Sequence, residues 1–121
     1  MPYREVYGES ITNVTFLRMT EVAMREKEIE GRLVSETKRR GGLCLKWVCP
    51  GFDGGPDRII LMPYGKVGFA ELKAPGRKPR LLQASRHRLF RKLGFAVYII
   101  DDPEQVTPVL DEIGGTGSGE V

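Results

Sequence analysis

The stretch PDRIILMPYGKVGFAELK, residues 56–73, decides the fold because it combines two strand-like runs with a short turn. Residues 57–62 and 67–73 are rich in β-branched and other apolar side chains, and the turn residues PYGK between them favour an antiparallel pairing. Residues 59–62 are apolar at every position, which is typical of a strand covered on both faces. We therefore expect a sheet with helices packed on each side.

The sequence on either side extends this hairpin into an α/β domain. Apolar spacing and turn residues predict seven elements: a helix over 20–40, strands over 43–49, 57–62 and 67–73, a helix over 80–93, a strand over 95–100, and a helical segment over 102–113. A helix between the third and fourth strands favours a parallel crossover, so the four-stranded sheet should be mixed. Residues 1–20 are expected to form an N-terminal arm, and residues 114–121 a disordered glycine-rich tail.

The composition is that of one globular domain. The chain has 121 residues, of which 40% are hydrophobic and 29% charged, and a single core serves chains of this length. No apolar run approaches the roughly 18 residues needed to span a bilayer. The first ten residues also lack the basic start and apolar stretch of a signal peptide. We expect a cytoplasmic protein with no membrane partner.

The charge is distributed unevenly along the chain. The formal net charge is only +3, but residues 72–100 contain eight basic and no acidic side chains. A segment of one sign favours contact with a polyanion, most commonly a nucleic acid, although a solvated helix surface would show the same pattern. The side chains expected to contact DNA are Arg77, Lys78, Arg80, Arg86 and Arg88.

Two carboxylates and a lysine are expected to meet at one end of the sheet. Glu71 and Lys73 share a face of the third strand, roughly 7 Å apart, and Asp57 begins the preceding strand. In an antiparallel pair the start of one strand lies beside the end of the other, so Asp57 should lie next to Glu71 and Lys73. Paired carboxylates suit Mg²⁺, and a lysine beside them can orient an attacking water or balance charge on a phosphate. This pattern indicates a phosphodiesterase.

These residues resemble a known nuclease motif. Pro56-Asp57 followed by Glu71-Leu72-Lys73 is similar to the PD-(D/E)xK signature of a large nuclease superfamily. Adding Ile29-Glu30 in the first helix and Gln83 in the basic helix, the order resembles the virus-type replication-repair nuclease (VRR-NUC) domain across about residues 24–107. The resemblance implies a restriction-endonuclease-like core and a nuclease domain over residues 21–113.

The resemblance also implies roles for individual residues. Asp57, Glu71 and the backbone carbonyl of Leu72 would hold Mg²⁺, or Mn²⁺ as a substitute, and Lys73 would be the catalytic lysine. Asp57 and the Glu71–Lys73 pair also have plain structural explanations, as a turn residue after Pro56 and as a surface ion pair.

The resemblance implies roles for two further residues. Glu30 would reach the metal directly or through water, and Gln83 would support the lysine or the scissile phosphate. A solvated helix face explains Glu30 equally well, and Gln83 could be a surface glutamine. We expect His87, which lies between two arginines, to be solvated or to touch a phosphate.

Members of the resembled family are DNases, and stand-alone versions resemble Holliday-junction resolvases that act as homodimers. The expected function is therefore a Mg²⁺-dependent DNA endonuclease, selective for branched DNA in replication, repair or recombination, in a bacterium or a phage-infected cell. A non-catalytic DNA-binding module with the same fold is the alternative. A sequence-specific restriction enzyme is disfavoured because no long loop or added domain is available for base readout.

Overall fold

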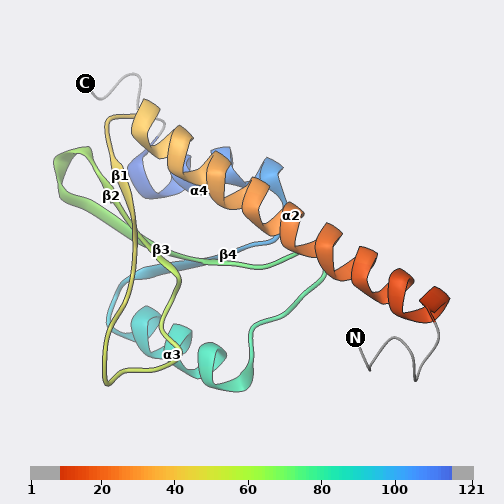
Figure 1. Ribbon diagram of the computed structural model, residues 1–121. Coiled ribbons are helices and arrows are strands. Elements are labelled where there is room, and N and C mark those ends of the chain that lie inside the picture. The colour runs from red at the N-terminus through yellow and green to blue at the C-terminus, as the bar shows by residue number, and fades with distance from the viewer. Residues whose placement is uncertain (1–8, 116–121) are drawn as a thin grey trace.

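The computed structural model describes residues 9–115, which form a mixed four-stranded sheet between helices (Figure 1). The elements in chain order are α2 (Glu9–Arg39), β1 (Leu43–Lys46), β2 (Arg58–Met62), the short 3₁₀ turn η1 (Pro63–Gly65), β3 (Lys66–Leu72), α3 (Leu81–Lys92), β4 (Ala96–Ile100), a second 3₁₀ turn η2 (Pro103–Gln105) and α4 (Val106–Gly114). The strands lie in the order β1-β2-β3-β4. The first two pairs are antiparallel and β3 pairs with β4 in parallel, which confirms the predicted antiparallel hairpin and parallel crossover.

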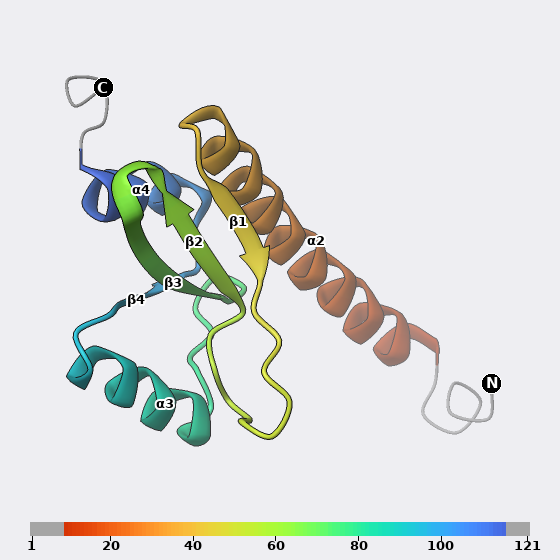
Figure 2. The same cartoon turned by 90° about the vertical axis from the view of Figure 1, so that its left-hand side faces the viewer.

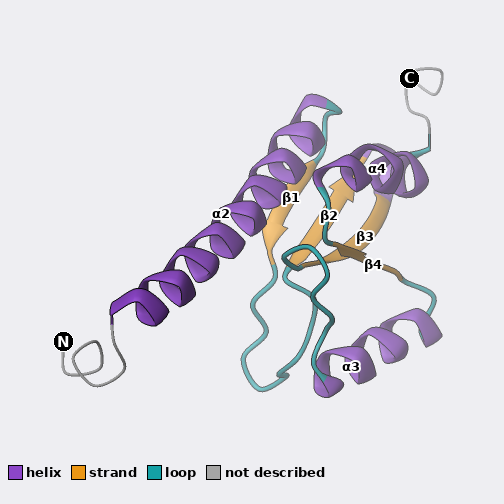
Figure 3. Ribbon diagram, turned by 90° about the vertical axis from the view of Figure 1, so that its right-hand side faces the viewer, coloured by secondary structure: helices purple, strands orange, loops and turns teal. Residues whose placement is uncertain are grey.

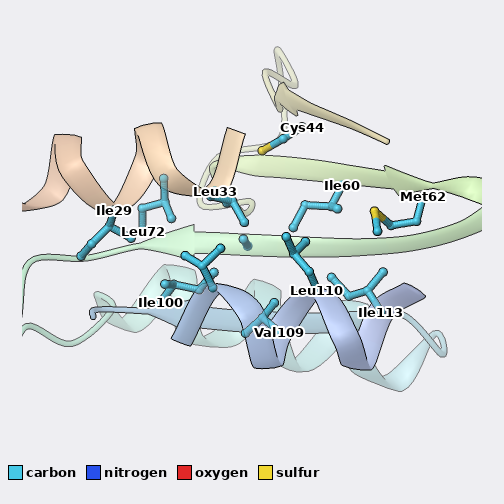
Figure 4. Packing of buried hydrophobic residues seen from close by; sticks show 12 residues of the cluster. Ile29, Leu33, Cys44, Ile60, Met62, Leu72, Ile100, Val109, Leu110 and Ile113 are labelled. Carbon is cyan, nitrogen blue, oxygen red and sulfur yellow. The ribbon is translucent and has the colours of Figure 1, made fainter. Parts of the chain in front are cut away.

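The helices cover the sheet on both faces. Helices α2 and α4 lie on one face and α3 lies on the other, as Figure 1 and Figure 2 show. The larger hydrophobic core lies under α2 and α4, where alternate residues of the strands meet side chains of both helices (Figure 4). Its fully buried members include Ile29 and Leu33 of α2, Ile60 of β2, Ile100 of β4 and Leu110 of α4. Burial on both faces explains the continuous apolar run of β2.

The opposite face of the sheet carries an aromatic group beneath α3. Phe69 of β3 makes edge-to-face contacts with Trp47 and Phe90, at ring-centroid distances of 5.3 and 5.0 Å. Because side chains of β3 alternate between faces, Phe69 and Glu71 both point toward α3, whereas Ala70 and Leu72 join the larger core. The site described below therefore lies on the α3 side.

Helix α2 begins much earlier than predicted. Residues 9–20 of the predicted N-terminal arm belong to the helix, which was expected to begin at residue 20, and residues 1–8 lie outside the described residues. The apolar spacing did not reveal this extension because its described apolar side chains, Leu17 and Met19, are exposed and join no core stripe. Its β-branched residues also have low helix propensity. The predicted tail falls almost wholly in residues 116–121, which are also outside the described part.

Strand β1 is shorter than predicted and β3 lies one residue earlier than predicted, and the ends of both strands shape the site. β1 stops at Lys46, after which the Trp47 amide donates a hydrogen bond to the Asp57 carbonyl at 2.8 Å. β3 stops at Leu72, although the Lys73 amide still bonds the Ile100 carbonyl at 3.0 Å. Within the described chain, no helix has the length and apolar character needed to cross a membrane.

Candidate active site

Asp57 and Glu71 meet where β2 begins and its antiparallel partner β3 ends. Arg58 pairs with Ala70, so Asp57, one residue earlier, comes beside Glu71, one residue later. The Leu72 amide donates a hydrogen bond to Asp57 Oδ2 at 2.9 Å, which holds one oxygen of that exposed carboxylate. The hairpin thus brings Asp57 and Glu71 together as the sequence predicted.

Glu71 is the most buried charged group of the site. Its side chain is 1% exposed, and its Oε2 accepts a hydrogen bond from Gln83 Nε2 at 2.8 Å and lies 3.3 Å from Lys73 Nζ. Its other oxygen, Oε1, has no hydrogen-bond partner among residues 9–115. One oxygen of Glu71 is therefore held by two donors while the other is left without one.

The site carries more negative charge than its lysine balances. Burial and the charge of Asp57 raise the pKa of Glu71 to about 7, against the lowering effect of Lys73. A carboxylate whose ionised form is disfavoured in this way is stabilised by a bound cation. The electrostatics thus favour a cation between Asp57 and Glu71.

The donor set suits a hard cation. Among residues 9–115, no group of three or more His, Cys, Asp or Glu side chains is arranged to hold a metal ion. Asp57, Glu71 and the backbone carbonyl of Leu72 could supply oxygen ligands, with water completing the shell. Mg²⁺ accepts one or two carboxylates with several waters.

A cavity of about 310 Å³ opens beside Asp57. Its lining includes Asp57, Leu72, Lys46 and Glu30, so α2 and the end of β1 form part of its wall. The structure therefore places Glu30 on the same cavity as Asp57. However, Arg58 binds Glu30 Oε2 through Nη2 at 2.9 Å and Nε at 3.3 Å, so this carboxylate already has a cationic partner that the sequence pattern did not reveal.

Gln83 is a buried part of the site and not a surface glutamine. Its Oε1 accepts a hydrogen bond from the Arg80 amide at 3.0 Å, and its Nε2 donates to Glu71. The first contact fixes which way the amide faces, so the N–H group points at the carboxylate. Gln83 therefore links the start of α3 to Glu71.

His87 is buried, which corrects the prediction that it is solvated. It is 1% exposed, and its Nε2 lies 3.6 Å from Glu71 Oε1. Burial and the charge of Arg91 lower the pKa of His87, so its ring is neutral at neutral pH. Helix α3 is rotated so that Gln83 and His87 face the sheet, while Leu81 and Leu93 are exposed by 89% and 66%. The spacing of four residues between Gln83 and His87 was the available signal for a shared polar face.

The basic residues predicted to contact DNA differ in their exposure and contacts. Arg77, Lys78, Arg80 and Arg88 are exposed. Arg86 instead places its guanidinium 4.1 Å from the ring centre of Phe52 and donates through Nε to the Asp53 carbonyl at 2.9 Å. Both partners lie in the β1–β2 connection, which reaches α3 in Figure 3. Arg86 therefore holds the loop that leads into Asp57.

Comparison with known proteins adds independent evidence. No protein-family model matches the chain. It is 43% identical over 81 residues to "Putative nuclease p44" of Acyrthosiphon pisum secondary endosymbiont phage 1, covering 67% of this chain and 87% of that protein. It also resembles a solved structure described as "VRR_NUC domain", with a TM-score of 0.67, 30% identity, and coverage of 73% of this chain and 95% of that one.

Proposed function

Because the chain belongs to the VRR-NUC domain family, we propose that it is a divalent-metal-dependent DNA endonuclease of the PD-(D/E)xK type. The observation that carries the proposal is the buried Glu71 carboxylate, joined by Asp57 and Lys73 and left with more negative charge than Lys73 balances. A divalent cation, Mg²⁺ or Mn²⁺, would resolve this imbalance. It would also polarise a phosphodiester oxygen and lower the pKa of a bound water.

The protein's own groups have distinct tasks in this proposal. Asp57 and Glu71 bind the cation, with help from the Leu72 carbonyl. The Lys73 ammonium, 3.3 Å from Glu71, orients the attacking water or balances charge on the phosphate as it becomes pentavalent. Gln83 keeps the Glu71 carboxylate in place through its 2.8 Å hydrogen bond. Glu30 acts through water, because Arg58 holds its Oε2.

The DNA backbone is expected to lie along the connection from β3 to α3. Arg77, Lys78 and Arg80 are exposed there, immediately after Lys73 in the chain, and Arg88 follows on α3. Phosphate contacts by such side chains give sequence-independent affinity that falls steeply with salt. Arg86 contributes by holding the loop before Asp57.

The test is cleavage of labelled DNA with Mg²⁺ or Mn²⁺. We expect Asp57→Asn and Lys73→Met to lower the cleavage rate about 100-fold or more while DNA binding and folding persist. Asp53→Asn is the matched control: it removes an exposed carboxylate four residues before Asp57, in the same loop, and should leave the rate unchanged. Wild-type cleavage in EDTA would overturn the metal mechanism, and DNA binding without cleavage in either ion would indicate a non-catalytic module.

We further propose that the enzyme acts on branched DNA as a homodimer. Residues 9–115 of each chain offer one such site, and symmetric incision of a four-way junction needs two sites related by a two-fold axis. A panel of four-way junctions, flaps and plain duplexes tests the preference, and junctions should be cut fastest. Equal cutting of all substrates would rule out selectivity for branched DNA.

A further inference from the structure

Two polar groups face each other in the buried part of the site without a hydrogen bond. Glu71 Oε1, His87 Nδ1 and His87 Nε2 have no partner among the described residues, and both side chains are 1% exposed. Leaving a buried donor or acceptor unsatisfied destabilises the folded state, and a charged group more than a neutral one. Such a pair therefore calls for an explanation other than packing.

The geometry points from one group to the other. His87 Nε2 lies 3.6 Å from Glu71 Oε1, just beyond hydrogen-bond distance. An imidazole ring carries at least one N–H in either protonation state, so it always has a donor to offer. Catalytic hydrogen bonds are often long before the ligand is bound. A small movement of either side chain would complete this one.

The rest of the Glu71 environment shows what this bond would add. Gln83 and Lys73 both contact Oε2, so the carboxylate is held at one oxygen only. Its other oxygen, Oε1, has no donor among the described residues. A donor at Oε1 would fix the plane of the carboxylate and orient its remaining lone pairs for a cation.

We propose that His87 is a positioning residue that donates a hydrogen bond to Glu71 Oε1 and thereby orients this carboxylate for the divalent cation. The inference rests on the proposed metal-dependent nuclease function. His87 touches neither the cation nor the DNA and acts through Glu71 alone. If His87 were only a core residue, an apolar side chain of similar size would serve as well or better, because it brings no unpaired polar atom.

The experiment measures Mn²⁺ binding to metal-stripped full-length protein by electron paramagnetic resonance. His87→Leu removes the donor and should weaken Mn²⁺ binding roughly 10-fold or more. His87→Gln places an amide N–H near the position of Nε2 and should restore most of the affinity. His87→Asn stays polar but is too short to reach Glu71, so it should bind Mn²⁺ as weakly as the leucine variant. Thermal unfolding without metal checks that each variant folds.

The outcomes separate the two proposals. Wild-type protein that binds no Mn²⁺, or binds it equally well as Asp57→Asn, would overturn the proposed metal site itself. Wild-type binding that depends on Asp57, together with unchanged affinity in His87→Leu and His87→Asn, would overturn only the role of His87. If His87→Leu does not fold, the comparison of His87→Gln with His87→Asn gives the same answer.

Discussion

The side chain of Glu71 contacts residues from three parts of the chain, whereas its position on β3 depends only on nearby sequence. Asp57 directly precedes β2, Gln83 and His87 come from α3, and Lys73 directly follows β3. Burial separates the carboxylate from water, and the charge of Asp57 adds to the cost of ionising it, which together raise its pKa to about 7. The residue is thus poorly placed for the stability of the metal-free fold and well placed to bind a cation.

This conflict predicts how stability changes with pH. The folded pKa of about 7 lies above the ordinary value of 4.5, so the folded state binds this proton more tightly than the unfolded state does. The contribution of Glu71 is therefore full below pH 4.5 and is lost as pH rises through 7. In EDTA, wild-type protein should lose roughly 3 kcal/mol relative to Glu71→Gln between pH 4.5 and 8. Urea unfolding of both proteins at several pH values measures this.

Comparison with Glu71→Gln is needed because other groups titrate. The lowered pKa of His87 works in the opposite direction, adding stability as pH rises through 6.5. Hydrogen bonds from Arg39 and Arg40 lower the pKa of Glu36 to about 2, so its protonation changes stability only in more acidic solution. Mg²⁺ at pH 8 should recover the wild-type loss and leave the variant unchanged. If the stability of wild type and Glu71→Gln changed with pH in the same way, the raised pKa of Glu71 would be contradicted.

At the scale of elements, the junction between α2 and β1 leaves no space for a side chain. A Cβ on Gly42 would lie 2.5 Å from the Leu61 carbonyl oxygen and 2.8 Å from Met62 Sδ. The backbone of β2 cannot yield as a flexible side chain can. The close approach of helix and strand therefore requires glycine here.

This junction gives a prediction with an internal control. Gly42→Ala should destabilise the fold by about 2–3 kcal/mol because the junction must open. Gly31→Ala is the matched control: nothing lies within 4 Å of its added Cβ on α2, so it should stabilise by about 0.5–1 kcal/mol through helix propensity. Urea unfolding measures both, and equal effects of the two substitutions would show that the junction is not tight.

At the scale of the molecule, the N-terminal part of α2 projects past the sheet (Figure 1). Leu17 and Met24 lie two helical turns apart on one face and are 64% and 65% exposed. A projecting helix that leaves its apolar side chains in water gains little from tertiary packing, which usually supplies most of a helix's stability. A second copy of the chain could cover this face.

The proposed homodimer can be tested at this face. The double variant Leu17→Glu/Met24→Glu should sediment at the 13.6 kDa of a single chain, whereas the wild type should show twice that mass. Met19→Glu is the control, because Met19 is 67% exposed and points to nearly the opposite side of α2. It should remain dimeric. A monomeric wild type would contradict the dimer, and a dimeric double variant would exclude this face.

The sequence by itself determined the order of elements, the mixed sheet and the meeting of Asp57 with Glu71. These features depend on local information: the two-residue alternation of strands, turn residues, and the antiparallel geometry of one hairpin. The motif residues also sufficed to indicate the VRR-NUC family, which the similarities to known proteins confirm. The roles of the individual site residues remain predictions.

Only the tertiary structure decided how the helices face the sheet and which partners the polar groups take. Helix α3 turns Gln83 and His87 toward the buried carboxylate of β3 and leaves Leu81 and Leu93 exposed. The pairing of Glu30 with Arg58 likewise joins residues 28 positions apart. These contacts join side chains from different helices and strands. The periodicity of apolar residues within one element does not predict them.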